Sequence, residues 1–183
     1  MYIELINSPI KPETNLEREI VSDIDFIEGA MWGKPRNGHP EGEVIYHIGE
    51  VLDNVNKMSN MHNRAELRLI AIIHDTFKNK VDQTKSKTGE NHHAMIARRF
   101  AEKYISDQHI LDIIELHDEA YNSWCKGARD GKWDKAEARA ISLIKRIDSY
   151  MPLYLTFFEC DSFTGDKATD SVKWFIEIYS NNK

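Results

Sequence analysis

Apolar residues recur along most of this chain at intervals of three and four, which is the period of an α-helix. Over residues 43–58, for example, Val44, Ile48 and Val51 fall on one face. The pattern predicts helices over residues 17–31, 43–58, 63–77, 91–105, 107–121, 135–158 and 167–179. Strand-like alternation is weak and confined to residues 2–6. The sequence therefore predicts an all-α protein, folded as a compact helical bundle.

Glycine and proline separate the predicted helices. Residues 33–42 contain two prolines and three glycines, and residues 78–89 form a polar, lysine-rich loop. Pro152 is expected to kink the helix over residues 135–158. Neither an internal repeat nor a low-complexity tract divides the 183 residues, so we expect a single domain over residues 1–183.

Histidine and aspartate occur on the apolar faces of several predicted helices. Each of the following lies three or four residues from apolar residues of its own helix: His47, His74, His117 and Asp148. Asp75 directly follows His74, at the end of the most apolar segment. Four different helices therefore direct a histidine or an aspartate toward the interior of the bundle.

A shared metal ion explains these buried polar residues together. Burying an imidazole or a carboxylate costs free energy unless a partner satisfies it, and for one histidine alone a hydrogen bond within the core is the usual solution. Three histidines and two aspartates in one core would each need such a solution, whereas one metal centre satisfies them all. Imidazole and carboxylate ligands without thiolate suit Mn, Fe, Co, Ni or Zn, so one or two divalent transition-metal ions are expected. Open coordination positions would make this centre catalytic.

The order and context of these residues resemble the HD superfamily of metal-dependent phosphohydrolases. The segment HPEGEVIYHIGEVLDNV (39–55) is similar to the opening of HD domains related to those of tRNA nucleotidyltransferases, and LIAIIHDTFK (69–78) is similar to the LLHDIGK motif. LIKRIDSY (143–150) is similar to the closing helix with its aspartate. The resemblance covers residues 38 to 152 and implies a compact HD-domain helical bundle. It also implies that a first metal ion is held by His47, His74, Asp75 and Asp148.

Many members of this superfamily hold a second metal ion with two further histidines. The matching residues are His117 and either His92 or His93. The register favours His92 as the ligand and leaves His93 to contact the substrate. Asp118 is placed to orient an imidazole. The chain departs from the HDIGK pattern, because Thr76 and Phe77 stand where isoleucine and glycine are usual.

The resemblance implies hydrolysis of a phosphate ester, in a nucleotide or an oligonucleotide. The metal would act as Lewis acid and water activator, and Asp75 would orient the water and accept its proton. Lys78, one turn beyond Asp75, and Arg36 are candidates to bind the phosphate. Trp32 is a candidate to stack on a base, although a hydrophobic cap is the alternative interpretation.

Two other functions fit the same residues. Some HD proteins hold a di-iron centre and act as oxygenases, and their ligand set is also histidine and aspartate. A nucleotide-binding regulatory module that keeps a structural metal is the non-catalytic alternative. Neither the identity of the metal and substrate nor the oligomeric state can be read from the sequence.

Charge and composition limit the partners. The formal net charge of -6 disfavours stable binding to long nucleic acid, so a small phosphate ester or nucleotide is the expected ligand. No segment has the ~20 consecutive apolar residues of a membrane helix, and the first ten residues lack the features of a signal peptide. Cys125 and Cys160 are far apart and fit free thiols. A cytoplasmic location is expected.

Overall fold

The computed structural model describes residues 8–35, 40, 42–58, 63–165, 167 and 169–182. Its longer helices are α2 (Asn15–Ser22), α3 (Ile24–Ala30), α4 (Val44–Met58), α5 (Arg64–Ile73), α6 (His93–Ala101), α7 (Gln108–Leu116), α8 (Glu119–Ala128), α9 (Trp133–Ile147), α10 (Met151–Ser162) and α11 (Asp170–Asn181). Among these residues the only β-type contact is an isolated bridge between Gly33 and Glu43. The all-α prediction is confirmed, while the weak strand expected over residues 2–6 lies outside the described ranges.

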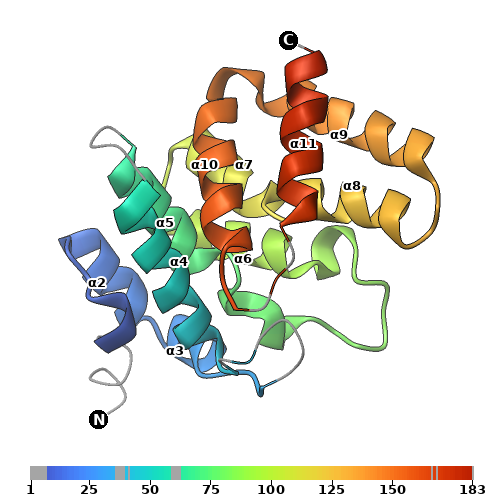
Figure 1. Cartoon of the computed structure of the whole chain (residues 1–183). Helices are drawn as coiled ribbons and strands as arrows, with labels where there is room; N and C mark the ends of the chain where they lie inside the picture. The colour runs from blue at the N-terminus through green and yellow to red at the C-terminus, as the bar shows by residue number, and fades with distance from the viewer. Residues whose placement is uncertain are drawn as a thin grey trace.

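The helices pack in two groups that share one hydrophobic core (Figure 1). In the first group α4 packs on α5, and α10 lies against both. In the second group α8 and α9 form a hairpin that α11 covers. Helices α6 and α7 pack together, and α7 also contacts α5. The ends of α5 and α7 therefore meet the side of α10 in the middle of the molecule.

Helix breaks occur at positions that periodicity alone did not predict. The helix expected over residues 17–31 is interrupted at Asp23, whose carboxylate accepts from the Asp25 backbone and caps α3 at 2.8 Å. The helix expected over residues 135–158 is also two helices. A short 3-10 helix, η3 (Asp148–Tyr150), separates α9 from α10, and Pro152 lies in the first turn of α10. Proline fits a first helical turn because its missing N–H is not needed there.

Close packing holds the chain beyond α5 against α3. A 3-10 helix, η1 (Thr76–Lys80), follows Asp75 and packs on α3. At Gly29 of α3, an added Cβ would collide with the carbonyl oxygen of Thr76. On the other side of α5, Arg68 forms a buried ion pair with Glu17 of α2, with Nε and Oε1 2.8 Å apart. These contacts fix the end of α5 from two directions.

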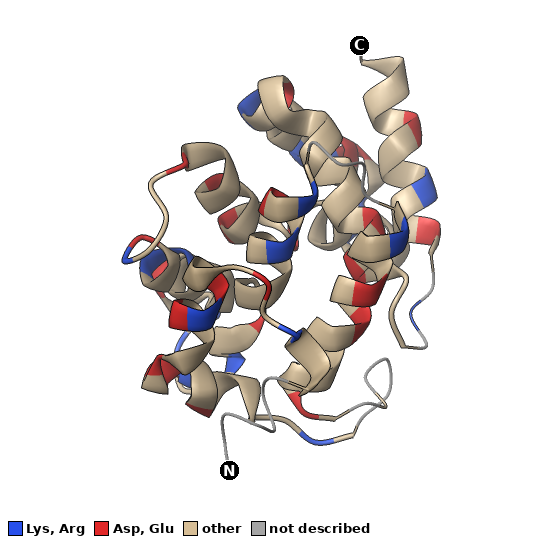
Figure 2. Ribbon diagram, turned by 90° about the vertical axis from the view of Figure 1, so that its left-hand side faces the viewer, with Lys and Arg blue, Asp and Glu red and all other residues tan. Residues whose placement is uncertain are grey.

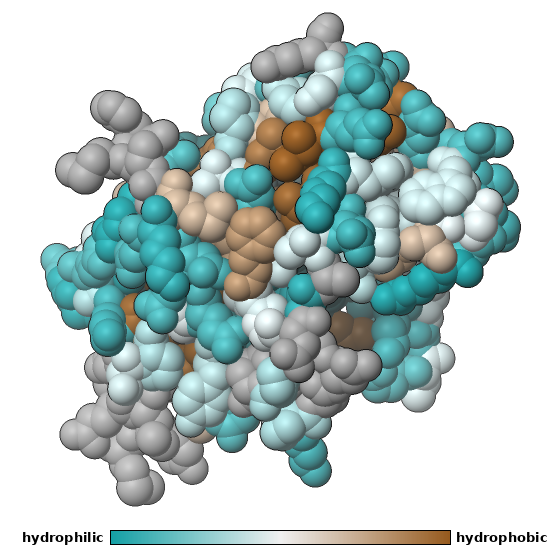
Figure 3. All heavy atoms as spheres, viewed as in Figure 1, coloured by the Kyte–Doolittle hydropathy of each residue, from teal (hydrophilic) through white to brown (hydrophobic). Residues whose placement is uncertain are grey.

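The molecular surface is mixed in charge and largely hydrophilic. Positively and negatively charged residues are interspersed along the ribbon in Figure 2, without a long run of one sign in that view. In Figure 3 apolar atoms reach the surface in a limited area between α10 and α11. Within the described residues, no helix is long and apolar enough to span a bilayer.

Candidate metal centre

A cluster of histidines and aspartates lies where the ends of several helices meet. His47 comes from α4, the pair His74-Asp75 follows α5, and Asp161 lies near the end of α10. His93 begins α6, and the pair His117-Asp118 separates α7 from α8. Five helices thus contribute side chains to one place, and most of these side chains are buried.

One half of this cluster, which we call the first subsite, consists of His47, His74, Asp75 and Asp161. The two histidine Nε2 atoms lie 3.3 Å apart. The Oδ1 atom of Asp161 is 3.1 Å from Nε2 of His47 and 3.8 Å from Nε2 of His74. The Oδ2 atom of Asp75 is 3.5 Å from Nε2 of His47 and 3.7 Å from Nε2 of His74. Four potential ligand atoms therefore converge on one small volume.

The other half, the second subsite, consists of Asp75, His93, His117 and Asp118. The Nε2 atoms of His93 and His117 lie 3.3 Å apart, and each is 3.3 Å from Oδ1 of Asp75. Asp118 places Oδ2 3.2 Å from Nε2 of His93. Asp75 consequently directs one oxygen to each subsite, which is the geometry of a carboxylate that bridges two metal ions.

Backbone carbonyls fix the orientation of two histidines. Nδ1 of His74 donates to the carbonyl oxygen of Ala71 at 2.9 Å, and Nδ1 of His117 donates to that of Ile114 at 2.8 Å. Each acceptor belongs to the last turn of the preceding helix, where carbonyl groups lack helical partners. Since these hydrogens are on Nδ1, the Nε2 lone pairs of the neutral rings are free to bind a metal.

The electrostatics of the first subsite fit a cation. Complete burial outweighs the nearby carboxylates and lowers the pKa of His74 to about 3, so this ring is neutral and its Nε2 is an acceptor. A single Nε2 hydrogen on His47 would face three acceptors, on His74, Asp75 and Asp161. One hydrogen cannot satisfy three acceptors well, whereas a metal ion can bind all four atoms. Oδ1 of Asp75, facing the second subsite, also accepts no well-formed hydrogen bond.

Burial and charge act in opposite directions at the second subsite. Burial lowers the pKa of His93, but the neighbouring carboxylates of Asp118 and Asp75 outweigh it and raise this pKa to about 9. Burial likewise raises the pKa of Asp118, but His117 and His93 hold it below its usual range. The metal-free second subsite therefore keeps its charges as imidazolium–carboxylate pairs.

The structure corrects the expected role of Asp148. This residue is exposed at the start of η3, and among the described residues it makes no contact with either subsite. The helix break between α9 and α10 shifts the ligand position along the chain, and Asp161 brings its carboxylate to His47 instead. A signal existed in the sequence, since Asp161 follows the buried Phe157 by four residues and so shares its face.

The structure places His93, and not His92, against Asp75 and His117. Nε2 of His93 points to Asp75 and His117, as described above. His92 instead caps α6, with Nδ1 accepting from the backbone N–H of Ala94 at 3.3 Å. The hydrogen of a neutral His92 ring is then on Nε2, which disfavours metal binding through that atom. His92 still lies beside His93 and Asp118, at the edge of the second subsite.

Two lysines pair with carboxylates of the first subsite. Lys78 forms an ion pair with Oδ2 of Asp75, so the predicted phosphate-binding lysine lies at the cluster. Lys167, which sequence reasoning did not single out, places Nζ 3.0 Å from Oδ1 of Asp161. Both ammonium groups are partly exposed.

Asn54 holds the segment that carries Asp161. Its amide donates to the carbonyl oxygens of Cys160 and Phe163, at 2.9 and 3.0 Å. Asn54 lies two turns beyond His47 on α4. The same helix therefore supplies one ligand candidate and positions another.

The remaining predicted substrate residues are not at the cluster. Trp32 is exposed, and its backbone oxygen accepts from Val44 at 2.9 Å. No contact between the Trp32 side chain and either subsite is found among the described residues. Arg36 lies outside them.

Comparison with family models assigns the chain to a protein family. The family model of the HD domain matches residues 44–150, which is more than half of the chain, and the chain therefore belongs to the HD domain family. The HD domain indicates the superfamily of metal-dependent phosphohydrolases, and the histidine–aspartate clusters fit the binding of divalent metal ions. Asp161 and Lys167 lie beyond the matched range. No curated protein and no solved structure shows significant similarity to the chain.

Proposed function

We propose that this protein is a metal-dependent phosphohydrolase that acts on a small organic phosphate ester, a nucleotide or an oligonucleotide. The observation that carries this proposal is the placement of Asp75, whose two oxygens face two separate groups of histidine nitrogens. A carboxylate in this position could be a ligand of two divalent ions, which would supply the chemistry of a two-metal phosphoryl-transfer site.

The ligand sets follow from the two subsites. His47, His74, Asp75 and Asp161 would hold the first ion, and Asp75, His93 and His117 would hold the second, with Asp118 orienting His93. The ions would supply Lewis acidity to the phosphate and lower the pKa of a water molecule.

The protein's own residues would bind the phosphate and move its protons. Lys78 and Lys167 would offset charge on the phosphate oxygens, because each ammonium already lies beside a carboxylate of the first subsite. Asp118 is partly exposed at the second subsite and could accept a proton from the attacking water. Asp75 is less suited to this role than expected, since both its oxygens face the cluster.

Hydrolysis of a panel of esters tests the proposal, measured as phosphate release from monoesters and as release of the alcohol from diesters. The protein would be loaded separately with Mn²⁺, Fe²⁺, Co²⁺, Ni²⁺ and Zn²⁺ and assayed against phosphate monoesters, phosphodiesters and nucleoside phosphates. We expect release with at least one metal, and its loss in Asp75→Asn. Lys78→Gln should retain the metal and lose about 2–4 kcal/mol of transition-state stabilisation, as for one preorganised donor.

Oxygen consumption should be measured in the same samples. Oxygen uptake by the iron-loaded protein, without hydrolysis of any ester under any metal, would contradict the proposal and support the oxygenase alternative. Release that persists in Asp75→Asn would instead point to a contaminating phosphatase.

A further inference from the structure

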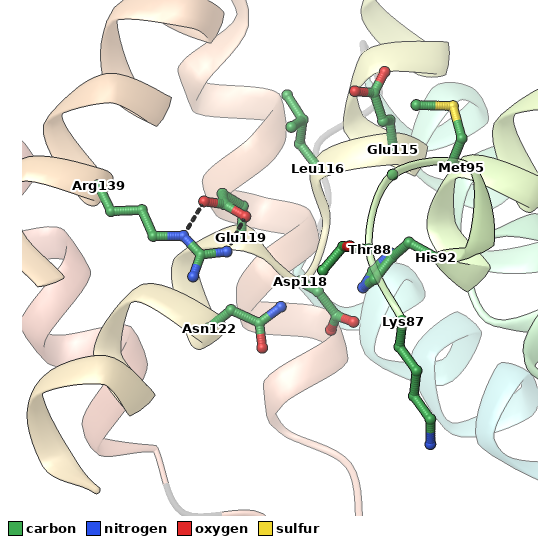
Figure 4. A pocket seen from close by; sticks show the side chains of 11 residues that line it. Lys87, Thr88, His92, Met95, Glu115, Leu116, Asp118, Glu119, Asn122 and Arg139 are labelled. Atoms are coloured by element: carbon green, nitrogen blue, oxygen red, sulfur yellow. Dashed lines mark hydrogen bonds and ion pairs between the residues drawn. The ribbon is translucent and has the colours of Figure 1, made fainter. Parts of the chain in front are cut away.

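A pocket of about 420 Å³ opens beside the second subsite. His92 and Asp118 form the wall that it shares with the cluster, and Figure 4 shows both side chains near its centre. The remaining walls come from the loop before α6 and from α6, α7, α8 and α9. The volume is within the range of pockets that take a small organic ligand. A phosphate ester bound at the metal centre can therefore extend its organic part into this pocket.

The charged side chains of the pocket are almost all paired with one another or with neighbours. Glu119 binds Arg139 through both of its oxygens, as the dashed lines in Figure 4 mark. Glu115 pairs with Arg98 and Arg146, at 2.8 and 2.9 Å. Both arginine–glutamate groups are thus already neutralised.

One further cation, at the rim of the pocket, contributes little to the binding of a charged ligand. Lys87 forms no ion pair with a described residue, but it is exposed, and in Figure 4 its side chain extends away from the other lining residues. An exposed ammonium contributes little to binding in water. By contrast, Lys78 and Lys167 are both at the first subsite. The two lysines therefore lie at the first subsite, whereas the pocket lies beside the second subsite.

The pocket can recognise an uncharged polar group. The amide of Asn122 lines it and makes no hydrogen bond with another described side chain or backbone group, so it can donate to and accept from a ligand. Met95 and Leu116 add apolar surface beside it. A wall with a free amide, a histidine and two apolar side chains suits a ligand such as a nucleoside, which has rings and hydrogen-bonding groups but no charge.

We propose that this pocket binds the uncharged alcohol part of the ester, of nucleoside size, while the phosphate lies on the side of Lys78 and Lys167. This inference rests on the proposed function and names its substrate class: phosphate esters of an uncharged alcohol of nucleoside size. Asn122 is the residue that determines this specificity.

Binding of the two parts of the substrate tests the pocket without turnover. Adenosine, cytidine and inorganic phosphate would each be titrated into the Mn²⁺-loaded protein by calorimetry. We expect Asn122→Leu to weaken nucleoside binding about tenfold, because it removes one hydrogen bond and leaves a ligand group unpaired. Phosphate affinity should not change. Asn181→Leu, the same substitution near the end of α11, is the matched control and should leave both affinities unchanged.

Turnover gives the second measurement. We expect kcat/KM for adenosine monophosphate to exceed that for methyl phosphate at least about tenfold, and Asn122→Leu to reduce this preference. Nucleoside binding that is unchanged in Asn122→Leu, or an equal kcat/KM for adenosine monophosphate and methyl phosphate, would overturn the inference. If methyl phosphate is hydrolysed but no nucleoside binds, the pocket assignment fails and the proposed function stands. If nucleosides bind through Asn122 but no ester is hydrolysed, the proposed function fails and the pocket assignment stands.

Discussion

The two ring nitrogens of a buried histidine have different partners in this centre. In His74 and His117 a backbone carbonyl takes the Nδ1 hydrogen, which leaves Nε2 to face Asp75. In His92 the direction of the hydrogen bond is opposite, because Nδ1 accepts a hydrogen bond from the backbone N–H of Ala94. A single local hydrogen bond therefore separates a ligand candidate from a pocket residue, although His92 and His93 are adjacent in sequence.

The first prediction concerns which of two aspartates, Asp161 or Asp148, is a ligand of the first metal ion. We expect Asp161→Asn to weaken metal binding at the first subsite by at least about 100-fold, because a direct ligand should matter more than the residues that orient ligands. Titration with Mn²⁺ and elemental analysis measure this change. Asp148→Asn is the matched control, since it makes the same substitution at an exposed residue, and it should bind as the wild type does. Loss of metal in Asp148→Asn alone would restore the assignment made from helical register.

Metal binding at the second subsite should release protons. The pKa of His93 is raised to about 9, so its ring is charged at neutral pH in the metal-free protein, whereas a metal ligand must be neutral. Affinity at this subsite should therefore rise with pH until about pH 9. His74, whose pKa is lowered to about 3, is already neutral and should release no proton.

Calorimetry in two buffers of different ionisation enthalpy measures this proton release at pH 7.5. The number of protons should fall in His93→Gln. A binding heat that does not depend on the buffer would show that the charged pair at His93 is absent, and would contradict the prediction.

At the scale of elements, the centre is built from two similar helix ends. Both α5 and α7 are apolar helices that stop directly before a His-Asp pair, and in both the histidine turns back to the carbonyl three residues earlier. The rings of His74 and His117 lie 5.0 Å apart, edge to face. Two independent helix ends thus have to be held in register, and this depends on the packing around them.

Gly29 is one place where this packing can be tested. We expect Gly29→Ala to destabilise the fold by about 1–3 kcal/mol, because an added Cβ would collide with Thr76, next to Asp75. Metal affinity should fall with it. Urea unfolding measures the free energy. Gly49→Ala in α4 is the control, because its Cβ would meet Pro9 at 3.2 Å and alanine gains up to about 1 kcal/mol of helix propensity. Equal destabilisation by both variants would argue against a special role for the contact at Thr76.

The sequence predicted which segments are helical better than it predicted where the helices begin and end. The spacing of apolar residues indicates which segments are helical, because each helix buries a stripe against the shared core. It does not show where a long apolar segment breaks, since a side chain such as Asp23 or a ring such as Pro152 decides that locally. The error at Asp148 came from this limit. A helix continued through η3 places Asp148 inward, and the break turns it to solvent.

Tertiary contacts account for what the sequence could not predict about the site. Both His92 and His93 have apolar neighbours one turn on, so only the capping bond of His92 distinguishes them. Lys167 is unremarkable in sequence and becomes relevant through its contact with Asp161. The extent of the domain over residues 1–183 stays a prediction.

At the scale of the whole molecule, three carboxylates gather at the centre. Asp75, Asp118 and Asp161 lie in or beside one cluster, and their charge is offset by Lys78, Lys167 and the histidines. A divalent ion would offset it more fully and would connect side chains from several helices. Binding of metal and stability of the fold should therefore be coupled.

Thermal unfolding measures this coupling. A metal at 100 times its dissociation constant adds about 2.7 kcal/mol at one site, which corresponds to a rise in Tm of about 5–10 °C for a chain of this size. We expect Mn²⁺ to produce such a rise and a chelator to reverse it. Asp75→Asn should remove most of the rise, because this residue serves both subsites, whereas Asp148→Asn should keep it. An equal rise in all three proteins would mean that the stabilising ion binds elsewhere, since a site that lacks its bridging carboxylate cannot keep the affinity of the intact centre.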